Sequence, residues 1–386
     1  MAVETSKPPS EKEQYLQHLV QILLAWRKSL CAIDRKTMAD LVGHDLVPKL
    51  FGRLLVMVVE NATHAGLLNE IHSETTVNER RFLYNFFAHV WSGRRNVLEI
   101  GPFLGGTTRA IAMGMSLNPN LDLQCRLHTF DKFSEYYKGE QFDNLLKQLI
   151  GNGHVGAEVR GTLNNSTSFR ELFLALHKAH EYFTLVEMNE RALPETPQEL
   201  SSLENLFTLD GGLEYDAVFV DGCKGWYSTK HFMREAAKVT RPGAYFIFQD
   251  YGWYTCFWIS TFLAVMGEYF TLVASVDNTY TFQLVKPLDV KELEGAFPDS
   301  PQGLGEPFFN SLFNQLIEQA AVKDDSYAQF VHNLHHAAAL AYLGNREGAR
   351  AKLMELASRP YPPGYRNLIQ CSLKSPTYTA EGPIYL

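Results

Sequence analysis

The chain has 386 residues, of which 46% are hydrophobic, so it can form two or three structural units with a sizeable core. Acidic residues outnumber basic ones, 43 to 35, and the net charge of −8 without a basic stripe argues against a general nucleic-acid binder. The five cysteines form no C-x-x-C pair, which predicts neither a disulfide framework nor a zinc ribbon and fits a reducing, cytoplasmic compartment. We find neither a signal-peptide pattern nor a run of about 18 apolar residues, so we expect no membrane partner.

The N-terminal quarter of the chain is predicted to be helical. Apolar residues recur at helical spacing from about residue 11 to residue 90, most clearly in residues 15–23 and 41–58. We therefore expect a helical N-terminal region over residues 1–92. It would act as a structural cap or as a surface for homo-oligomer formation.

A buried strand is predicted at residues 96–100, and it runs directly into a glycine-rich turn and the start of a helix. The turn reads Glu-Ile-Gly-Pro-Phe-Leu-Gly-Gly-Thr-Thr, from Glu99 to Thr108. An open α/β sheet presents a nucleotide-like ligand in this way at the carboxyl ends of its strands. The spacing matches neither the dinucleotide fingerprint, which needs Gly where Phe103 stands, nor a P-loop. An ordinary turn without a ligand is the alternative for this stretch alone.

Strands and helices alternate through the central region. Further strands are predicted at residues 127–130, 157–160, 215–220 and 244–248, followed by a hairpin of residues 270–276 and 279–285. A long insertion is predicted between residues 164 and 213. The alternation predicts a mostly parallel sheet, and the closing hairpin predicts one antiparallel edge strand.

Proline and glycine become frequent after about residue 287, which predicts a linker to a helical C-terminal region over residues 291–386. Residues 337–350 are similar to one tetratricopeptide hairpin, but such arrays need about three repeats, so we expect a helical appendage. Three histidines, His332, His335 and His336, lie in this region without a partnering carboxylate pattern, and we expect no metal there.

Four acidic residues fall at or beside predicted strand ends: Glu99, Asp131, Asp221 and Asp250. The carboxyl ends of strands line one crevice in an open α/β sheet, where these carboxylates would repel one another unless ligands or a metal compensate. Asp131 lies roughly twenty-five residues past the glycine turn, near the usual place of a ribose-binding acid. It can accept two hydrogen bonds from ribose hydroxyls.

Two further segments complete a recognisable order of motifs: Asp221-Gly222 after the predicted fourth strand, and Gln249-Asp250-Tyr251 after the fifth. Together with the glycine turn, this order resembles the macrocin O-methyltransferase and cephalosporin-hydroxylase-like branch of the class I S-adenosylmethionine (SAM)-dependent methyltransferases. The resemblance covers roughly residues 95–287. It implies a Rossmann-like α/β fold, with a SAM-binding methyltransferase domain at residues 93–290 between helical N- and C-terminal additions.

The resemblance also implies a set of site residues. The cofactor-binding candidates are Glu99, Gly101, Phe103, Gly105, Thr107, Thr108, Asp131 and Thr162. Glu99 would orient the turn or meet the ammonium of SAM, while Thr162 stands near the place where the family often has an adenine-binding Asp. A divalent metal, usually Mg²⁺ in that branch, would be held by Asp221, Gln249 and Asp250. Gln249 replaces an acid of the family pattern, and its amide oxygen can still bind a hard cation.

Three residues are the catalytic candidates: Lys224, Asp221 and Asp250. The family commonly has a histidine base where Lys224 stands. A lysine acts as a base only when its pKa is lowered, which neighbouring carboxylates oppose. Lys224 would therefore orient the acceptor or replace the charge of the metal, and a solvated surface lysine is the alternative.

The activity that the resemblance implies is O-methylation of a small hydroxylated acceptor, a sugar-containing or other specialised metabolite, with or without metal assistance. Methylation at nitrogen or carbon is a second interpretation. A non-catalytic SAM-fold protein that serves in assembly is a third, since the usual histidine and one acid are replaced.

Overall fold

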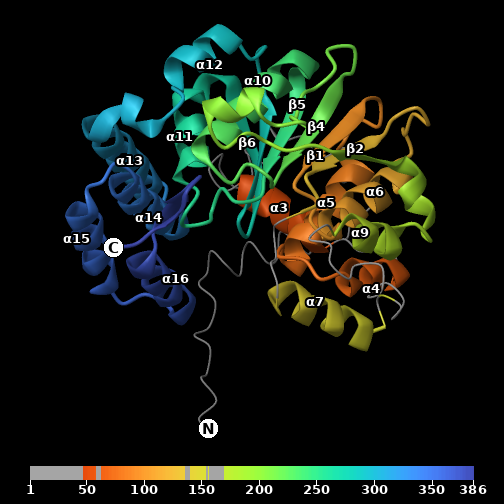
Figure 1. Cartoon of the computed structure of the whole chain (residues 1–386), viewed down its shortest axis with the longest axis horizontal. Helices are drawn as coiled ribbons and strands as arrows, with labels where there is room; N and C mark the ends of the chain where they lie inside the picture. Colours follow the sequence, from red (N-terminus) through yellow and green to blue (C-terminus); the bar gives the residue numbers. More distant parts are fainter. Residues whose placement is uncertain (1–46, 58–61, 135–139, 154, 156–168) are drawn as a thin grey trace.

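The computed structural model describes residues 47–57, 62–134, 140–153, 155 and 169–386 of the chain. The helices predicted before residue 47, the strand predicted at residues 157–160 and the candidate Thr162 lie outside these ranges. In the described part, a seven-stranded sheet occupies the centre and helices cover both of its faces (Figure 1). Among these residues, no helix is both long and apolar enough to cross a lipid bilayer.

The central sheet has the strand order β3-β2-β1-β4-β5-β7-β6. Its strands are β1 (Asn96–Ile100), β2 (Leu127–Asp131), β3 (Val186–Glu190), β4 (Tyr215–Val220), β5 (Thr240–Phe248), β6 (Phe270–Val276) and β7 (Thr279–Leu284). Strands β1 to β5 pair in parallel, whereas β7 is antiparallel to β5 and to the edge strand β6. This is the Rossmann-like class I methyltransferase sheet that the sequence predicts. The order reverses between β1 and β4, where such sheets bind ligands.

The third strand lies elsewhere than predicted. Strand β3 pairs with β2 from Leu127↔Val186 to Asp131↔Glu190, inside the segment predicted as an insertion. Its sequence, Val-Glu-Met-Asn-Glu, lacks an apolar run because it is an edge strand and is only partly buried. Strand β5 also begins at residue 240, before the predicted residue 244.

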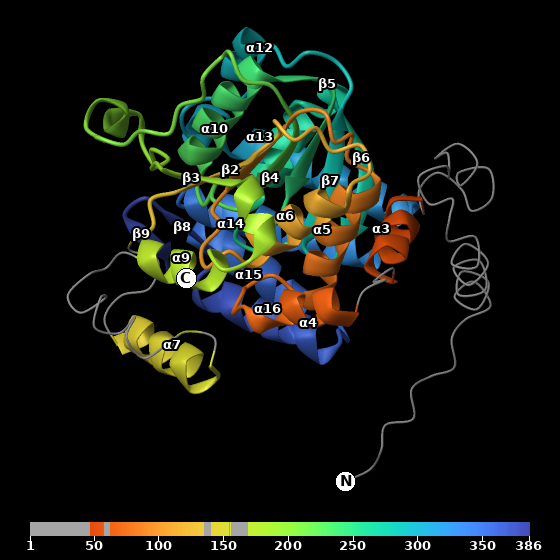
Figure 2. The same cartoon turned by 90° about the vertical axis from the view of Figure 1, so that its right-hand side faces the viewer.

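Two sets of helices pack on opposite faces of the sheet (Figure 1). One face carries α3 (Val47–Met57), α5 (Val77–His89) and α6 (Gly106–Leu117). The other carries α10 (Trp226–Val239), α11 (Phe257–Val265), α12 (Val290–Ala296) and α13 (Gly305–Val322). Three further helices, α4 (Ala62–Glu70), α7 (Glu140–Gly151) and α9 (Arg170–His177), lie around the first set, with α7 at the periphery (Figure 2).

The C-terminal residues form a run of helices followed by a small hairpin. The elements are α14 (Ser326–Tyr342), α15 (Arg346–Ala357), α16 (Pro363–Lys374), β8 (Thr377–Thr379) and β9 (Gly382–Ile384). As predicted, a turn at Gly344, with φ +92°, separates α14 from α15. Two of the α14 histidines join helices: His335 Nδ1 lies 2.8 Å from Ser260 Oγ, and His336 Nε2 lies 2.7 Å from Asn310 Oδ1.

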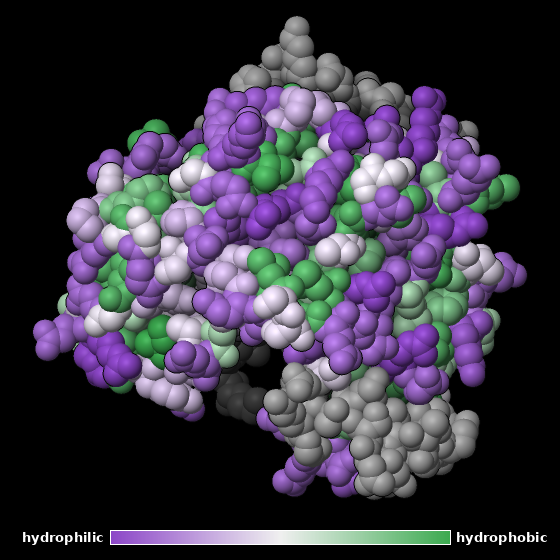
Figure 3. Space-filling model, turned by 45° about the horizontal axis from the view of Figure 1, so that its top comes forward, coloured by the Kyte–Doolittle hydropathy of each residue, from purple (hydrophilic) through white to green (hydrophobic). Residues whose placement is uncertain are grey.

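The surface of the described residues is mainly polar. Figure 3 shows one face on which hydrophilic side chains predominate and apolar side chains lie in scattered patches between them. Such mixing is ordinary for a folded protein, whose surface retains many apolar atoms.

Candidate active site

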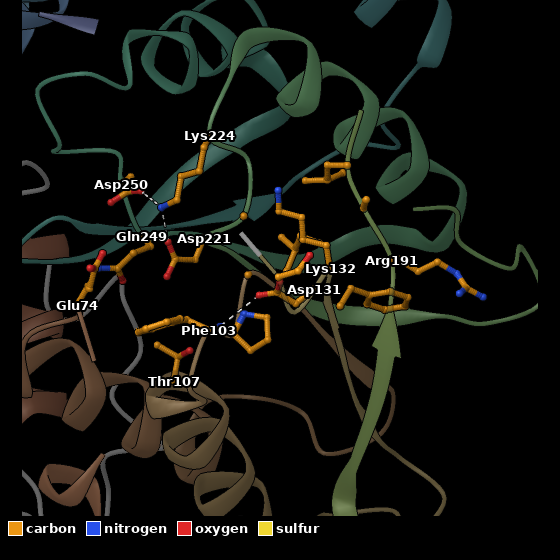
Figure 4. Close-up of a pocket in the computed structure, with 18 of the residues that line it drawn as sticks. Glu74, Phe103, Thr107, Asp131, Lys132, Arg191, Asp221, Lys224, Gln249 and Asp250 are labelled. Carbon is orange, nitrogen blue, oxygen red and sulfur yellow. Dashed lines mark hydrogen bonds and ion pairs between the residues drawn. The ribbon is translucent and has the colours of Figure 1, made fainter. Parts of the chain in front are cut away.

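A cavity of about 590 Å³ opens where the carboxyl ends of β1, β2, β4 and β5 meet. Each of these strands supplies a wall residue at or just past its end: Gly101, Asp131, Asp221 and Gln249. The cavity therefore lies at the switch point of the sheet, and its volume is typical of a small-molecule site. Figure 4 shows one group of side chains around Asp131, with Lys132 and Arg191, and a second group around Lys224.

The glycine turn brings the ends of β1 and β4 into close contact. Gly101 has φ +82°, a conformation that L-residues rarely adopt, and a Cβ added there would lie 2.6 Å from the backbone nitrogen of Gly222. The backbone nitrogen of Asp221 donates to the carbonyl of Ile100 at 3.0 Å, and that of Gly101 donates to Phe130 at 3.0 Å. Glycine is required here by the approach of two backbone segments that form the cavity floor.

Glu99 supports the glycine turn through hydrogen bonds to the start of α6. The side chain is fully buried, and its two oxygens accept hydrogen bonds from Thr107 Oγ1 and Thr108 Oγ1, each at 2.7 Å. Burial raises the pKa of Glu99 to about 7, and the hydrogen bonds from the threonines oppose that rise. These contacts tie the end of β1 to the first turn of α6. Of the predicted cofactor residues, Gly101, Phe103, Thr107 and Asp131 line the cavity, whereas Glu99, Gly105 and Thr108 are not among its lining residues.

Asp131 is positioned by backbone donors. Its Oδ1 accepts from the backbone nitrogen of Phe133 at 2.8 Å, and its Oδ2 accepts from that of Phe103 at 3.4 Å. Burial raises the pKa of Asp131 to about 6, although these donors favour the charged form. A carboxylate has about four acceptor positions, so Asp131 can also accept hydrogen bonds from a ligand in the cavity.

An ion-pair cluster occupies the other end of the cavity. Lys224 Nζ lies 2.7 Å from Asp221 Oδ1 and also contacts Asp250 Oδ2, so the ammonium bridges the two carboxylates (Figure 4). The side chain of Lys224 is 36% exposed, and those of Asp221 and Asp250 are 21% and 20% exposed. The cluster therefore faces the cavity.

The cluster keeps Lys224 protonated. Burial by itself would lower the pKa of Lys224, but the charges of Asp221 and Asp250 outweigh it and raise that pKa well above its usual value. Burial raises the pKa of Asp221, and the Lys224 ammonium opposes this effect. An ammonium with a raised pKa donates hydrogen bonds and does not accept a proton, so Lys224 is unsuited to act as a base at neutral pH.

Gln249 is held by a separate hydrogen-bond network. Its side chain is buried, and its Oε1 accepts a hydrogen bond from Thr279 Oγ1 at 2.7 Å. Thr279 Oγ1 also lies 2.9 Å from Glu79 Oε1, which accepts from the backbone nitrogen of Asn278 at 3.0 Å. Glu79 belongs to the capping box that starts α5, with Thr76 as the N-cap. Helix α5 and the β6–β7 turn thus hold the Gln249 oxygen in this network.

The divalent metal expected at Asp221, Gln249 and Asp250 does not fit these residues. The three side chains do meet at one cavity, but the Lys224 ammonium lies between the two carboxylates. The Gln249 oxygen already accepts a hydrogen bond from the hydroxyl of Thr279. In the part of the chain that the structure describes, no group of three His, Cys, Asp or Glu side chains could hold a metal ion.

Several cavity residues were missed by the sequence analysis. They are Ser73, Glu74 and Thr75 before α5, Lys132 after β2, and Arg191, Ala192, Leu193, Glu195 and Glu199 after β3. Figure 4 shows Glu74 beside Gln249. The Thr76-x-x-Glu79 capping box could have placed a loop before α5, but no local pattern indicates that this loop covers the end of β5.

No family model matches the chain, and no curated protein matches it. Among solved structures, it is similar to a putative O-methyltransferase from Klebsiella pneumoniae, with 16% identity over 62% of this chain and 97% of that one and a TM-score of 0.35. It is also similar to an O-methyltransferase from Bacillus cereus in complex with SAH (17% identity, 63% and 100%, TM-score 0.34). A third is CalS11, a TDP-rhamnose 3'-O-methyltransferase of calicheamicin biosynthesis (13% identity, 73% and 99%, TM-score 0.33). The fold follows from the strand order independently of these likenesses.

Proposed function

We propose that the protein is a SAM-dependent methyltransferase that methylates a hydroxyl group of a small molecule, such as a sugar-containing or other specialised metabolite. One observation carries this proposal. A single cavity at the switch point of a methyltransferase-type sheet has the glycine turn and Asp131 at one end and a charged cluster at the other.

The donor end would hold SAM through Gly101, Phe103, Thr107 and Asp131, which line the cavity. Asp131 would accept hydrogen bonds from the ribose hydroxyls. Glu99 would support this end indirectly, because it fixes Thr107 and Thr108 at the start of α6. When bound, SAM supplies a methyl group on a positively charged sulfur that is open to attack by a nucleophilic oxygen.

The acceptor end would hold the hydroxyl to be methylated. Asp221 and Asp250 are proton acceptors that face the cavity, so either could take the hydroxyl proton as the oxygen bonds to the methyl carbon. The methyl–sulfur bond would break in the same step, and the sulfur would leave as the neutral thioether of S-adenosylhomocysteine. Positioning of two reactants by one site is worth on the order of 7–11 kcal/mol of the barrier. The expected divalent metal is not part of this proposal, because the residues present do not fit it.

The decisive test is calorimetric titration of the protein with SAM and with S-adenosylhomocysteine. We expect both to bind, and we expect Asp131→Ala to weaken both. The matched control is Asp143→Ala, which removes an exposed acid on α7. Mass spectrometry of a metabolite extract incubated with protein and SAM should then show a molecule heavier by one methyl group. A protein that binds neither ligand would contradict the proposal, and binding without any methylated product would favour the assembly role.

A further inference from the structure

We propose that Lys224 takes the place of a divalent cation in this active site, so that its ammonium holds Asp221 and Asp250 together, binds the acceptor oxygen and makes methyl transfer independent of metal. This inference rests on the proposed function for the reaction it serves. The placement of the lysine itself does not depend on that function.

The first argument is the position of the ammonium. Its nitrogen contacts one oxygen of each carboxylate, Asp221 Oδ1 at 2.7 Å and Asp250 Oδ2. A metal ion held between these two carboxylates would need the space that the ammonium fills. A divalent cation placed beside the ammonium would also be repelled by it. The lysine and a metal therefore exclude each other.

The second argument is charge. Two departures from the expected metal site occur together: Gln249 carries no charge where an acid was expected, and Lys224 carries a positive charge where a histidine was expected. Two carboxylates and one ammonium leave the cluster with a single net negative charge. Two partly buried carboxylates at one cavity repel each other unless a cation compensates, and Lys224 supplies that cation.

The third argument is the hydrogen bonding of the Gln249 side chain. Its oxygen is the ligand that could have completed a metal site, yet it points to Thr279 Oγ1 at 2.7 Å. The network through Glu79 and Asn278 ties that arrangement to α5 and to the β6–β7 turn. Recruiting Gln249 to a metal would turn its oxygen away from Thr279 and rearrange this buried network.

The chemistry available to Lys224 follows from its three N–H donors. Asp221 and Asp250 use two of them, and the partly exposed side chain can direct the third into the cavity. An acceptor oxygen bound there would lie next to a positive charge. Negative charge that develops on this oxygen as its proton passes to Asp221 or Asp250 would be stabilised by the ammonium, as by an oxyanion-hole donor.

Hydrogen bonds to the loop backbone also fix the position of Lys224. Trp258 Nε1 on α11 donates to the carbonyl of Cys223 at 3.1 Å, and the backbone nitrogen of Lys224 donates to Gly222 at 3.0 Å. Trp258 in turn packs edge-on against Tyr378 of β8, with ring centroids 5.4 Å apart. The loop that carries the lysine is therefore held by the same helical layer that receives the C-terminal hairpin.

The test is a titration of the protein with Mn²⁺ alone, followed by electron paramagnetic resonance. We expect the unmodified protein to bind no Mn²⁺ at this site and its turnover to be unchanged by EDTA. Lys224→Ala frees the carboxylate pair, so it should gain a Mn²⁺ site while losing roughly 10²–10³-fold in turnover. Lys224→Ala with Gln249→Asp should bind Mn²⁺ more tightly still. Lys238→Ala, which removes a lysine paired with Glu235 outside the cavity, is the matched control.

Two outcomes would overturn the inference. One is a stoichiometric Mn²⁺ site in the unmodified protein together with activity abolished by EDTA. The other is a folded Lys224→Ala variant that binds no more Mn²⁺ than Lys238→Ala does. If Lys224→Ala does not fold, Lys224→Arg keeps the charge and the Mn²⁺ titration of the unmodified protein still decides. These titrations need neither SAM nor an acceptor, so their failure is distinct from a failure to bind SAM.

Discussion

The two ends of the cavity are built in different ways. At the donor end, Glu99 binds Thr107 and Thr108, which are close to it in sequence, although the glycine turn also packs on Gly222. At the acceptor end, charges from β4 and β5 meet, and α5 and the β6–β7 turn hold Gln249. The link from Glu99 to α6 is thus local, whereas the acceptor end depends on distant elements throughout. The comparison predicts that substitutions at the two ends will affect different measurements.

The largest effect is expected for Gly101→Val at the donor end. Valine would have to adopt φ +82°, and its Cβ would lie 2.6 Å from the backbone of Gly222. A left-handed conformation alone costs an L-residue about 1–2 kcal/mol, and the clash adds to it. We expect calorimetry to show no SAM binding and thermal unfolding to show a lower midpoint. Gly295→Ala, at a helical glycine with no neighbour within 4 Å, should leave SAM binding unchanged and should not lower the midpoint. Normal SAM binding by Gly101→Val would contradict the proposed role of the glycine turn in SAM binding.

The next largest effect is expected for Asp250→Ala and Asp221→Ala at the acceptor end. Each removes one partner of the Lys224 ammonium and one proton acceptor. Turnover should fall by roughly 10²–10³-fold, while the dissociation constant of SAM should change little. Initial rates and calorimetry on the same preparations separate the two quantities. Full activity in Asp250→Ala would show that the cluster does not act on the acceptor.

A pH-dependent effect on stability is expected at Glu99. Its pKa is about 7 in the folded protein and near 4.5 in an unfolded chain, so the folded state binds the proton more tightly. Stability should therefore fall as the pH rises from about 4.5 through 7, by up to about 3 kcal/mol from this group. Glu99→Gln should remove this part of the slope in urea unfolding between about pH 5 and pH 8. Asp131 shifts in the same direction in both proteins, so the difference between them isolates Glu99. Identical slopes would contradict the assignment.

The smallest effect is expected for Thr377→Val in the C-terminal hairpin. The buried Thr377 Oγ1 donates to the carbonyl of Thr255 at 3.1 Å and ties β8 to the segment before α11. Losing this bond should cost about 1 kcal/mol in the free energy of unfolding. It should lower turnover slightly without changing SAM binding, because the hairpin supports only the acceptor end. Thr379→Val, whose hydroxyl contacts Gly382 within the hairpin itself, is the control. A change in SAM affinity in Thr377→Val would mean that the two ends are not independent.

The sequence pattern was informative wherever a strand is buried on both faces. Strands β1, β2 and β4 lie where the apolar runs predict them, because buried positions demand apolar side chains. The β6–β7 hairpin was also predicted, although β6 is a partly exposed edge strand. The edge strand β3 was missed, since its partly exposed face accepts Glu and Asn. The metal expectation is not supported for a related reason: single residues were carried over from a family pattern without knowledge of their partners.

The amino-acid sequence by itself indicated most of the donor end, because the strand, the glycine turn and the two threonines of that motif lie within a dozen residues. Glu99 and Gly101 were recognised there, although their contacts were not. Only the tertiary structure decided the acceptor end. Lys224 was a candidate base, a metal substitute or a surface lysine until the ends of β4 and β5 placed Asp221 and Asp250 on either side of its ammonium. Electrostatic pairing depends on distances in space, and those distances are set by the packing of the whole sheet.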